Sequence, residues 1–269
     1  MNYRVNKASL SYHVQNKTIL GSDEVLLNKA IDLTGKFNWA EKGFTIEPFY
    51  GEDKYISFRK ETEQFILSLW KKAGLTIDKD FPLEKYHQLA IDQEVHLAAV
   101  EQTKLISTEY FPLGIHQLEE RISEICKEQL HVRNPFDNQS VFHFRVIRPH
   151  SKDNNPLHRD VWLEDYSDCI NLYIPIAGSN IDSSLIIAPG SHRWPESKIE
   201  RTLSGAEINE IKFNVPAVAK IDGEVEFIRP DPGLNEVLVF SPYLIHGGAS
   251  NLNNEFTRIS IEIRLWKKS

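Results

Sequence analysis

The stretch "FTRISIEIRLW", residues 256–266, decides the fold class, because its side chains alternate between apolar and polar. Successive side chains of a β-strand point to opposite faces, so this pattern predicts a strand with one apolar and one polar face. The apolar face carries Ile259, Ile261, Ile263 and Leu265, and the polar face carries Arg258, Ser260, Glu262 and Arg264. Such a strand belongs to a sheet whose polar face is either in water or lines a polar cavity.

Two earlier segments show the same alternation. His143 and Arg145 alternate with apolar residues in "VFHFRVIRP", and Asn171 and Tyr173 do so in "CINLYIPI". Turn-forming Pro, Gly, Asn and Asp separate these segments from others of strand character. The predicted strands are 141–149, 169–176, 183–190, 219–228, 235–241 and 256–266. Many short strands of this kind predict a sandwich or a barrel.

The first half of the chain has a different pattern, with apolar residues recurring at helical spacing. Helices are predicted in "SFRKETEQFILSLWKKAG" and "GIHQLEERISEICKEQL", and also at 24–35 and 83–106. Helices first and strands later indicate an α+β fold. We therefore expect one domain over residues 1–269, in which about 1–134 is mainly helical support and about 135–269 is the core.

Composition excludes several classes of protein. The chain has 269 residues, 41% of them hydrophobic and 26% charged, and a formal net charge of −7. An acidic chain without a long basic run is a poor partner for nucleic acid or an anionic membrane. No apolar run is long enough to span a bilayer, and no signal peptide is recognisable. Cys126 and Cys169 lack the spacing of a zinc site or a disulfide framework, so we expect buried cysteines and a cytoplasmic location.

The stretch "NNPLHRDVWLED", residues 154–165, contains His-Arg-Asp, which protein kinases also have in their catalytic loop. A kinase needs an Asn five residues after this Asp, a glycine-rich phosphate loop and a DFG motif. Asp165 stands at the first of these positions, and neither motif is present in the sequence. The kinase interpretation therefore fails.

The same tripeptide fits a metal site. His158 and Asp160 have the i, i+2 spacing that directs two side chains to one face of an extended segment. His246 follows a distant apolar strand, and two histidines with one carboxylate form the facial triad that holds non-haem iron(II). Arg258 lies twelve residues after His246, and Ser260 shares its face. An arginine with a neighbouring hydroxyl can bind a carboxylate through charge-assisted hydrogen bonds.

These residues resemble the phytanoyl-CoA dioxygenase family of iron(II)/2-oxoglutarate-dependent oxygenases, over about residues 135–266. "LHRD", "SSLIIAPGSH" and "LIHGGASN" carry the resemblance, together with Arg258. It implies a double-stranded β-helix, which is a cupin-like jelly roll buttressed by the N-terminal helices. It also implies that His158, Asp160 and His246 bind Fe(II) and that 2-oxoglutarate and O2 are co-substrates. His192 is structural in this family pattern and is not expected to bind metal.

The resemblance further implies that Arg258 and Ser260 bind the side carboxylate of 2-oxoglutarate. If the alternation is right, Asn171 and Tyr173 also point toward the co-substrate. The expected substrate contacts are His143, Arg145, Trp162 and Arg264. Related halogenases have Gly or Ala in place of Asp160, so hydroxylation is expected rather than halogenation.

The expected substrate is a small metabolite, polar or anionic because Arg145 and Arg264 need partners if they are buried. Two alternatives remain at this stage. One is a cupin-like metal protein that does not use 2-oxoglutarate, and the other is a non-catalytic binding protein on the same fold. No catalytic residue beyond the metal site is expected.

Overall fold

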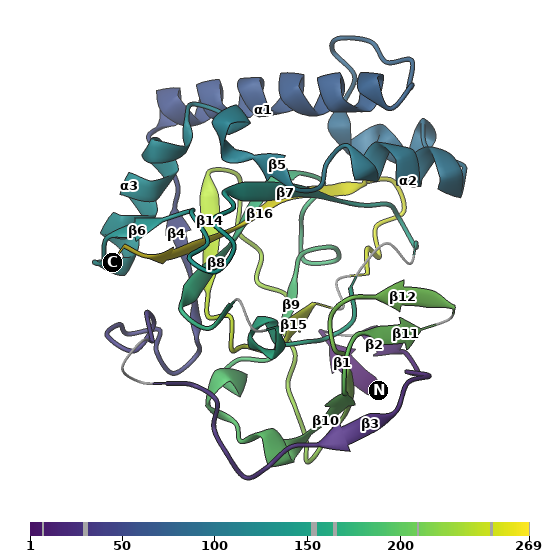
Figure 1. The fold of residues 1–269 in the computed structure, drawn as a ribbon. Helices are drawn as coiled ribbons and strands as arrows, with labels where there is room; N and C mark the ends of the chain where they lie inside the picture. The colour runs from purple at the N-terminus through teal and green to yellow at the C-terminus, as the bar shows by residue number, and fades with distance from the viewer. Residues whose placement is uncertain are drawn as a thin grey trace.

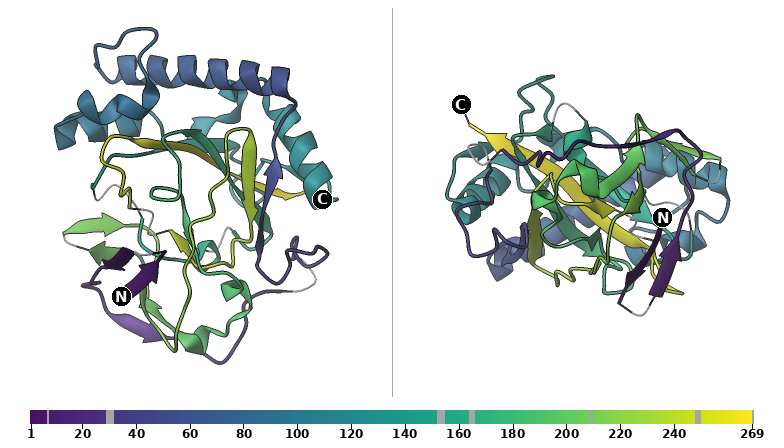
Figure 2. Two further views of the ribbon diagram at one scale, coloured as in Figure 1. Left: turned by 180° about the vertical axis from the view of Figure 1, so that it is seen from behind. Right: turned by 90° about the horizontal axis from the view of Figure 1, so that it is seen from below.

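A computed structural model describes residues 1–6, 8–28, 32–151, 155–163, 166–208, 210–247 and 250–268. Three α-helices lie on one side of a large antiparallel sheet, and smaller sheets lie on its other side (Figure 1). The view from behind shows the same order of layers, with the helices and the N-terminal strands on opposite sides of the sheet (Figure 2). Within the described ranges, no helix is long and apolar enough to cross a membrane.

The large sheet is built mainly from the second half of the chain. Its strands run in the order β4 (Phe44–Pro48), β14 (Glu236–Phe240), β8 (Cys169–Ala177), β16 (Arg258–Lys267), β7 (Val141–Ile147) and β5 (Ile106–Ser107), and β6 (Leu130–His131) pairs with β16. β16 is central and pairs with β7 on one side and with β8 on the other, both antiparallel. The strand that decided the fold class from the sequence is therefore the middle of the sheet.

The smaller sheets face the polar side of the large one. They are β1 (Asn2–Val5) with β2 (Ala8–Ser11); β3 (Thr18–Leu20) with β10 (Ile199–Thr202) and β13 (Val218–Ile221); β11 (Ala206–Ile208) with β12 (Ile211–Phe213); and β9 (Ile186–Ile187) with β15 (His246–Gly247). β15 pairs with β9 and so carries His246 into this second layer.

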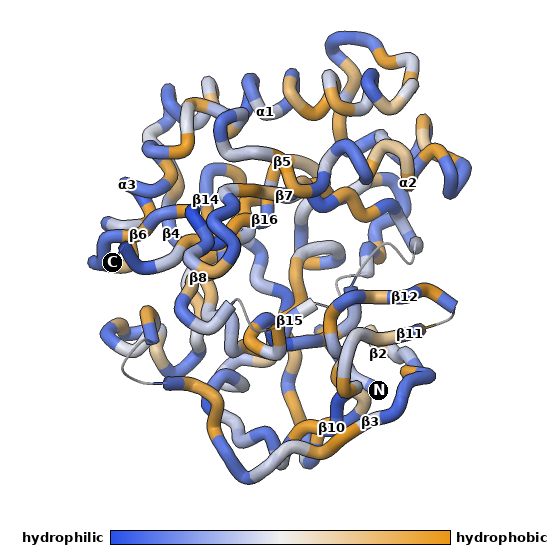
Figure 3. The backbone as a smooth tube through the Cα atoms, viewed as in Figure 1, coloured by the Kyte–Doolittle hydropathy of each residue, from blue (hydrophilic) through white to orange (hydrophobic). Residues whose placement is uncertain are grey.

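Helices α1 (Glu52–Lys72), α2 (Gln93–Glu101) and α3 (Ile115–Cys126) cover the apolar face of the large sheet. α1 begins with acidic and ends with basic residues, which is the charge order that the helix dipole favours. Phe58 of α1 packs with Phe111, whose ring packs edge-on against Phe142 of β7. Hydrophobic segments accordingly gather along β5 and β7 beneath α1 (Figure 3).

The alternation in β16 is confirmed. The four residues of its apolar face all belong to the main core, which also contains the buried hydrophobic residues of α1 and α3. Three residues of its polar face, Arg258, Glu262 and Arg264, line a cavity on the opposite side. Of the two interpretations that the alternation allowed, the polar cavity is thus the one that the fold adopts. The two cysteines are buried and form no disulfide, as expected.

Several sequence predictions of elements were wrong. No helix forms in the described residues of 24–35, and residues 83–106 break into the 3-10 turn η1 (Leu83–Gln88) and the short α2. Residues 89–92 are not helical and separate η1 from α2, so the apolar spacing of 83–106 did not correspond to one continuous helix. The first 48 residues form β1 to β4, which the sequence analysis did not predict. Conversely, the predicted strand 183–190 is reduced to the two residues of β9.

Candidate metal centre

The backbone itself brings His158 and His246 together. Each donates its N–H to the carbonyl oxygen of the other, at 2.9 Å in both directions, as an isolated antiparallel bridge. The approach requires a glycine after His246. A Cβ on Gly247 would lie 2.4 Å from the Pro156 carbonyl oxygen and 3.0 Å from His158 Nδ1. Gly247 also has a φ of +110°, which side chains rarely adopt.

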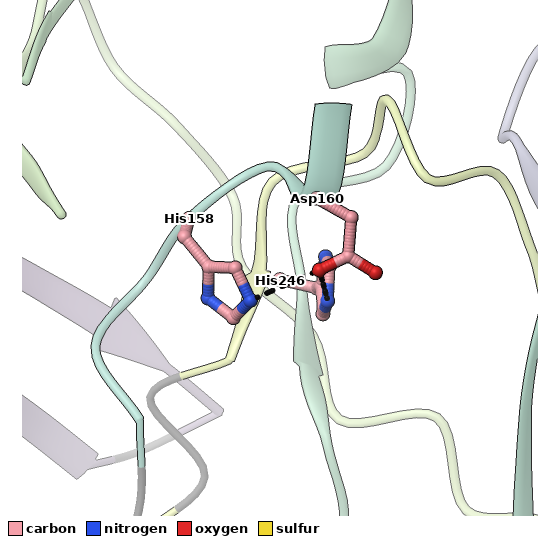
Figure 4. Close-up of side chains that lie close together, drawn as sticks. All are labelled: His158, Asp160 and His246. Atoms are coloured by element: carbon pink, nitrogen blue, oxygen red, sulfur yellow. Dashed lines mark ion pairs between the residues drawn. The ribbon is translucent and has the colours of Figure 1, made fainter. Parts of the chain in front are cut away.

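The side chains of His158, Asp160 and His246 converge on one point (Figure 4). Asp160 Oδ1 lies 3.3 Å from His158 Nε2 and 3.6 Å from His246 Nε2. The potential ligand atoms of the three residues all lie within 4.8 Å of one another, and all three side chains are buried. The structure therefore assembles, from two distant segments, the set that the sequence analysis named.

The outer nitrogens of both imidazoles are fixed by backbone carbonyls. His158 Nδ1 lies 2.8 Å from the Pro156 carbonyl oxygen, and His246 Nδ1 lies 2.9 Å from that of Leu244. A carbonyl only accepts hydrogen bonds, so each Nδ1 carries the proton and each Nε2 presents a lone pair to the centre. Burial, and then the neighbouring His158, lowers the pKa of His246 to about 4, so that imidazole is neutral near pH 7.

Asp160 is oriented through one of its oxygens and open at the other. Oδ2 accepts hydrogen bonds from Asn171 Nδ2 at 2.9 Å and from Arg264 Nη2 at 2.8 Å and Nε at 3.1 Å. Oδ1 has no hydrogen-bond partner among the described residues although it is buried. Burial would raise the pKa of this carboxyl, but the Arg264 guanidinium, His246 and His158 together outweigh burial and hold the pKa well below its usual range.

This donor set fits a divalent metal ion. Two imidazole nitrogens and one carboxylate oxygen are the ligands of the facial triad, and Asp160 Oδ1 has no hydrogen-bond partner among the described residues. The carbonyls behind the imidazoles, and Arg264 behind the carboxylate, supply the outer contacts that orient metal ligands. His158, Asp160 and His246 line a cavity of about 240 Å³. A metal ion held by these three residues would therefore have space for further ligands on the cavity side.

Arg258 lines the same cavity and is 2% exposed. Its Nε and Nη1 atoms have no hydrogen-bond partner in the described part of the chain, and neither has the hydroxyl of the fully buried Ser260. The guanidinium lies over the ring of Tyr173, 5.6 Å from its centroid. A buried cation without an acid partner is costly, so this arrangement calls for an anionic ligand.

The other predicted site residues are placed as follows. Asn171 and Tyr173 line the cavity, but Asn171 supports Asp160, and the Tyr173 hydroxyl lies 2.7 Å from Ser179 Oγ. His143 and Arg145 line it too. The structure does not bring Trp162 there, because its indole N–H donates to Glu196 at 3.0 Å.

Two further sequence inferences are clarified. His192, not expected to bind metal, lies with Nε2 2.9 Å from the Ala40 carbonyl oxygen. The sequence predicts a polar or anionic substrate from Arg145 and Arg264, but each of these arginines is already paired with an acid. Arg145 bonds Glu262 at 2.7 Å, and Arg264 bonds Asp160. Neither arginine therefore leaves an unbalanced charge for a substrate, and the argument for an anionic one fails.

Sequence reasoning missed Ser191, which ties both ligand segments together. Its hydroxyl accepts the N–H of Ile245 at 2.8 Å, next to His246. Its carbonyl accepts a hydrogen bond from the fully buried Arg159, which lies between His158 and Asp160 in the sequence. Arg159 is in turn paired with Glu196. The "PGSH" motif was the available signal, but nothing in the sequence identifies which atoms it contacts.

We expect Ser191→Ala to weaken metal binding about 10-fold or more, the usual effect of removing an outer contact of a metal site. The substitution leaves the buried Ile245 N–H without a partner, which costs about 1–3 kcal/mol of stability. Titration of the metal-free protein with Fe(II) under argon and urea unfolding measure the two effects. Ser197→Ala, on the surface, is the control. Unchanged metal affinity in the Ser191 variant would refute this positioning role.

The metal-free protein should lose stability as the pH falls from about 6.5 to about 4. Burial is the main reason that the pKa values of both His246 and His143 are lowered from 6.5 to about 4. In this window the unfolded chain binds protons that the folded chain does not, so acid favours unfolding. Glu262 contributes to the loss of stability only below pH 4.5, because its pKa is lowered from 4.5 to about 2. Urea unfolding at pH 7 and pH 5 measures how steeply the free energy of unfolding depends on pH.

His143→Gln removes one of the two histidines with a lowered pKa, so the free energy of unfolding should depend less steeply on pH. The exposed His116 offers the matched substitution His116→Gln, which should leave this pH dependence unchanged. Equal unfolding free energies at pH 7 and pH 5 in the wild type would contradict this origin of the acid sensitivity.

The chain matches no family model, and no curated protein matches it in sequence. Solved structures do match it. AviO1 from Streptomyces viridochromogenes Tue57 aligns over 90% of this chain and 96% of its own, with a TM-score of 0.50 and 15% identity. EctD from S. alaskensis, crystallised with 2-oxoglutarate and 5-hydroxyectoine, covers 95% and 86% with a TM-score of 0.48 and 11% identity. The non-heme alpha ketoglutarate dependent carbocyclase SnoK covers 92% and 87%, with a TM-score of 0.46 and 13% identity.

At 15% identity, the likeness to AviO1 establishes a shared fold over most of both chains. Fold and site together define a class: an antiparallel β scaffold with a buried site of two histidines and one aspartate that opens into a cavity. A fold by itself hosts many functions, so the site residues carry the functional argument.

Proposed function

We propose that this protein is a non-haem Fe(II)/2-oxoglutarate-dependent dioxygenase that hydroxylates a small molecule and releases succinate and CO2. One observation carries the proposal. The His-Asp-His site and the unpartnered Arg258 line one cavity. A site for a divalent metal beside a buried cation suits a co-substrate that chelates the metal at one end and ends in a carboxylate at the other.

In this proposal His158, Asp160 and His246 hold the iron, and Arg258 with Ser260 pairs the distal carboxylate of 2-oxoglutarate. Arg264 and Asn171 fix Asp160 Oδ2, so that Oδ1 stays available to the metal. Iron with 2-oxoglutarate and O2 supplies the oxidising power for the C–H bond, while the protein binds, orients and encloses the reactants. The apolar Leu172, Leu185 and Phe240 also line the cavity.

Finer assignments belong to the same proposal. The resemblance to the phytanoyl-CoA dioxygenase family supports a double-stranded β-helix that works as one domain over residues 1–269. The retained Asp160 supports hydroxylation over halogenation, because its carboxylate occupies the place that a halide needs. The two free buried cysteines are compatible with work in the reducing cytoplasm.

Two rival functions make different predictions. A cupin-like protein that does not use 2-oxoglutarate does not explain why the charge of Arg258 is buried in the cavity. A non-catalytic binding protein has no need of three metal ligands with fixed tautomers and orientation. Both rivals predict no dependence on 2-oxoglutarate.

The test is succinate formation from 2-oxoglutarate by protein loaded anaerobically with Fe(II) and then exposed to O2 with a pool of small metabolites. A thermal shift with 2-oxoglutarate and metal provides a reading that needs no turnover. Succinate formation that depends on iron and is stimulated by the pool would support the proposal. No succinate from any pool together with no thermal shift would reject it.

A further inference from the structure

Three polar side chains of β7 and β16 line the cavity but have no part in the proposed binding of metal or co-substrate. They are His143 and Arg145 of β7 and Glu262 of β16. Glu262 stands opposite His143 in the register, and Arg145 stands opposite Ser260. β7 pairs with β16 on the side away from β8, which carries Asn171 and Tyr173. The three therefore form a separate wall of the same cavity.

Arg145 and Glu262 form an ion pair that leaves polar atoms for a ligand. Arg145 Nε donates to Glu262 Oε2 at 2.7 Å, and the side chains remain 34% and 24% exposed. Within the described part of the chain, no hydrogen bond occupies the terminal Nη atoms of Arg145 or Glu262 Oε1. The pair thus offers N–H donors beside a carboxylate acceptor, and its net charge is zero.

His143 adds a donor whose position is fixed. Its Nδ1 accepts the backbone N–H of Leu105 at 3.1 Å, so the proton of the neutral ring is on Nε2. Burial, and then the nearby Arg145, lowers the pKa of His143 to about 4, so the ring is neutral near pH 7. This imidazole contributes an N–H donor and no charge.

We propose that His143, Arg145 and Glu262 form the substrate subsite and that it binds a neutral, hydroxyl-rich molecule such as a sugar or another polyol. The inference rests on the proposed function. A hydroxyl group both donates and accepts, so neighbouring hydroxyls can donate to Glu262 Oε1 and accept from Arg145 or His143 without breaking the ion pair. Hydrogen bonds to charged groups contribute more binding free energy than hydrogen bonds between neutral groups. Hydroxyl groups that bind to Arg145 and Glu262 therefore gain more than they would from neutral partners.

Charged substrates fit this wall less well. Arg145 and Glu262 are in direct contact, so any charged ligand that binds there is close to both. The carboxylate of Glu262 repels an anion, and the guanidinium of Arg145 repels a cation. A zwitterion has to lose the hydration of both its charges on binding. Arg145 and Glu262 already neutralise each other, so their attraction for the charges of the zwitterion compensates little of this desolvation cost. The hydroxylated group keeps the pair intact and avoids this desolvation.

The remaining wall suits the carbon skeleton of such a molecule. Leu163 and Val215 line the cavity with apolar surface, and so does the ring of Tyr166, which lies 4.3 Å from the Arg264 guanidinium carbon. Polar recognition on one side with apolar contact on the other is the usual composition of a small-molecule site.

The test is calorimetric titration of the full chain loaded with Fe(II) and 2-oxoglutarate under argon, so that no turnover occurs. The probes are methyl glycosides of glucose, galactose and mannose, the matching uronates, the matching amino sugars, and serine as a zwitterion. We expect at least one neutral glycoside to bind, and its charged counterparts to bind at least tenfold more weakly. Binding by none of the neutral probes, or tighter binding of a charged one, overturns the inference.

Glu262→Gln keeps the shape of the side chain and removes its charge. It should weaken the neutral glycoside at least tenfold but should not weaken 2-oxoglutarate, since the lost charge is negative. Glu255→Gln, at a side chain 73% exposed, is the matched control and should change neither affinity. Unchanged glycoside affinity in Glu262→Gln also overturns the inference. Failure of the wild type to bind 2-oxoglutarate rejects the proposed function instead, so the two failures are distinguishable.

Discussion

Replacing His246 by alanine should abolish high-affinity iron binding and, with it, any 2-oxoglutarate turnover. In the proposed metal site His246 supplies one of two nitrogen ligands, and its Nε2 faces Asp160 Oδ1 at 3.6 Å. Loss of an outer contact of a metal site already costs about 10–100-fold in affinity, so loss of a ligand should cost more than 100-fold. Fe(II) titration of the metal-free protein under argon measures the change.

The buried position of His246 requires a check on folding. Alanine leaves a cavity, so some loss of stability is expected even without metal. The decisive reading is therefore the increase in melting temperature that the metal produces, because a ligand that binds only the folded state stabilises it. This increase should vanish in His246→Ala and persist in His116→Ala, at an exposed histidine. A variant that folds and keeps the full increase would show that His246 is not a ligand.

The sequence predicted the parts of the molecule that obey a local rule. The alternation in residues 256–266 required one apolar and one polar face, and β16 has both, buried against the helices and lining the cavity. The spacing of His158 and Asp160 likewise predicted two side chains that converge. His246 could be named because it follows an apolar strand, although only the bridge to His158 shows how the two segments meet.

Long-range partners could not be predicted in this way. The sequence does not reveal that Arg264 binds Asp160, 104 residues away, or that Arg145 binds Glu262, 117 residues away. Without knowledge of those pairs, the arginines suggested a polar or anionic substrate, and in the structure the charge of each arginine is balanced by its partner. The strands of the first 48 residues are short and pair with one another or with distant segments, so no periodicity reveals them. Trp162 looked available beside the motif because Glu196, its partner, lies 34 residues away.

Arg258→Met should weaken 2-oxoglutarate binding strongly while leaving the metal site intact. Removing one partner of a buried, hydrogen-bonded charge pair costs about 2–5 kcal/mol, which corresponds to a loss of roughly 30-fold to several thousand-fold in affinity. Arg258 is not in contact with the triad through any hydrogen bond that the structure records, so Fe(II) affinity should stay within about threefold of the wild type. Calorimetry with 2-oxoglutarate and Fe(II) in turn, under argon, measures both affinities.

The same substitution should not destabilise the protein in the absence of co-substrate. Two nitrogens of Arg258 are buried without a hydrogen-bond partner among the described residues, and an apolar side chain of similar length removes this cost. Urea unfolding of the metal-free variant should therefore give a stability equal to or above that of the wild type, while added 2-oxoglutarate with metal no longer stabilises it. Arg133→Met, at an exposed arginine, should behave as the wild type in every measurement. If Arg258→Met bound 2-oxoglutarate as tightly as the wild type, the cation would serve another ligand and the co-substrate assignment would be wrong.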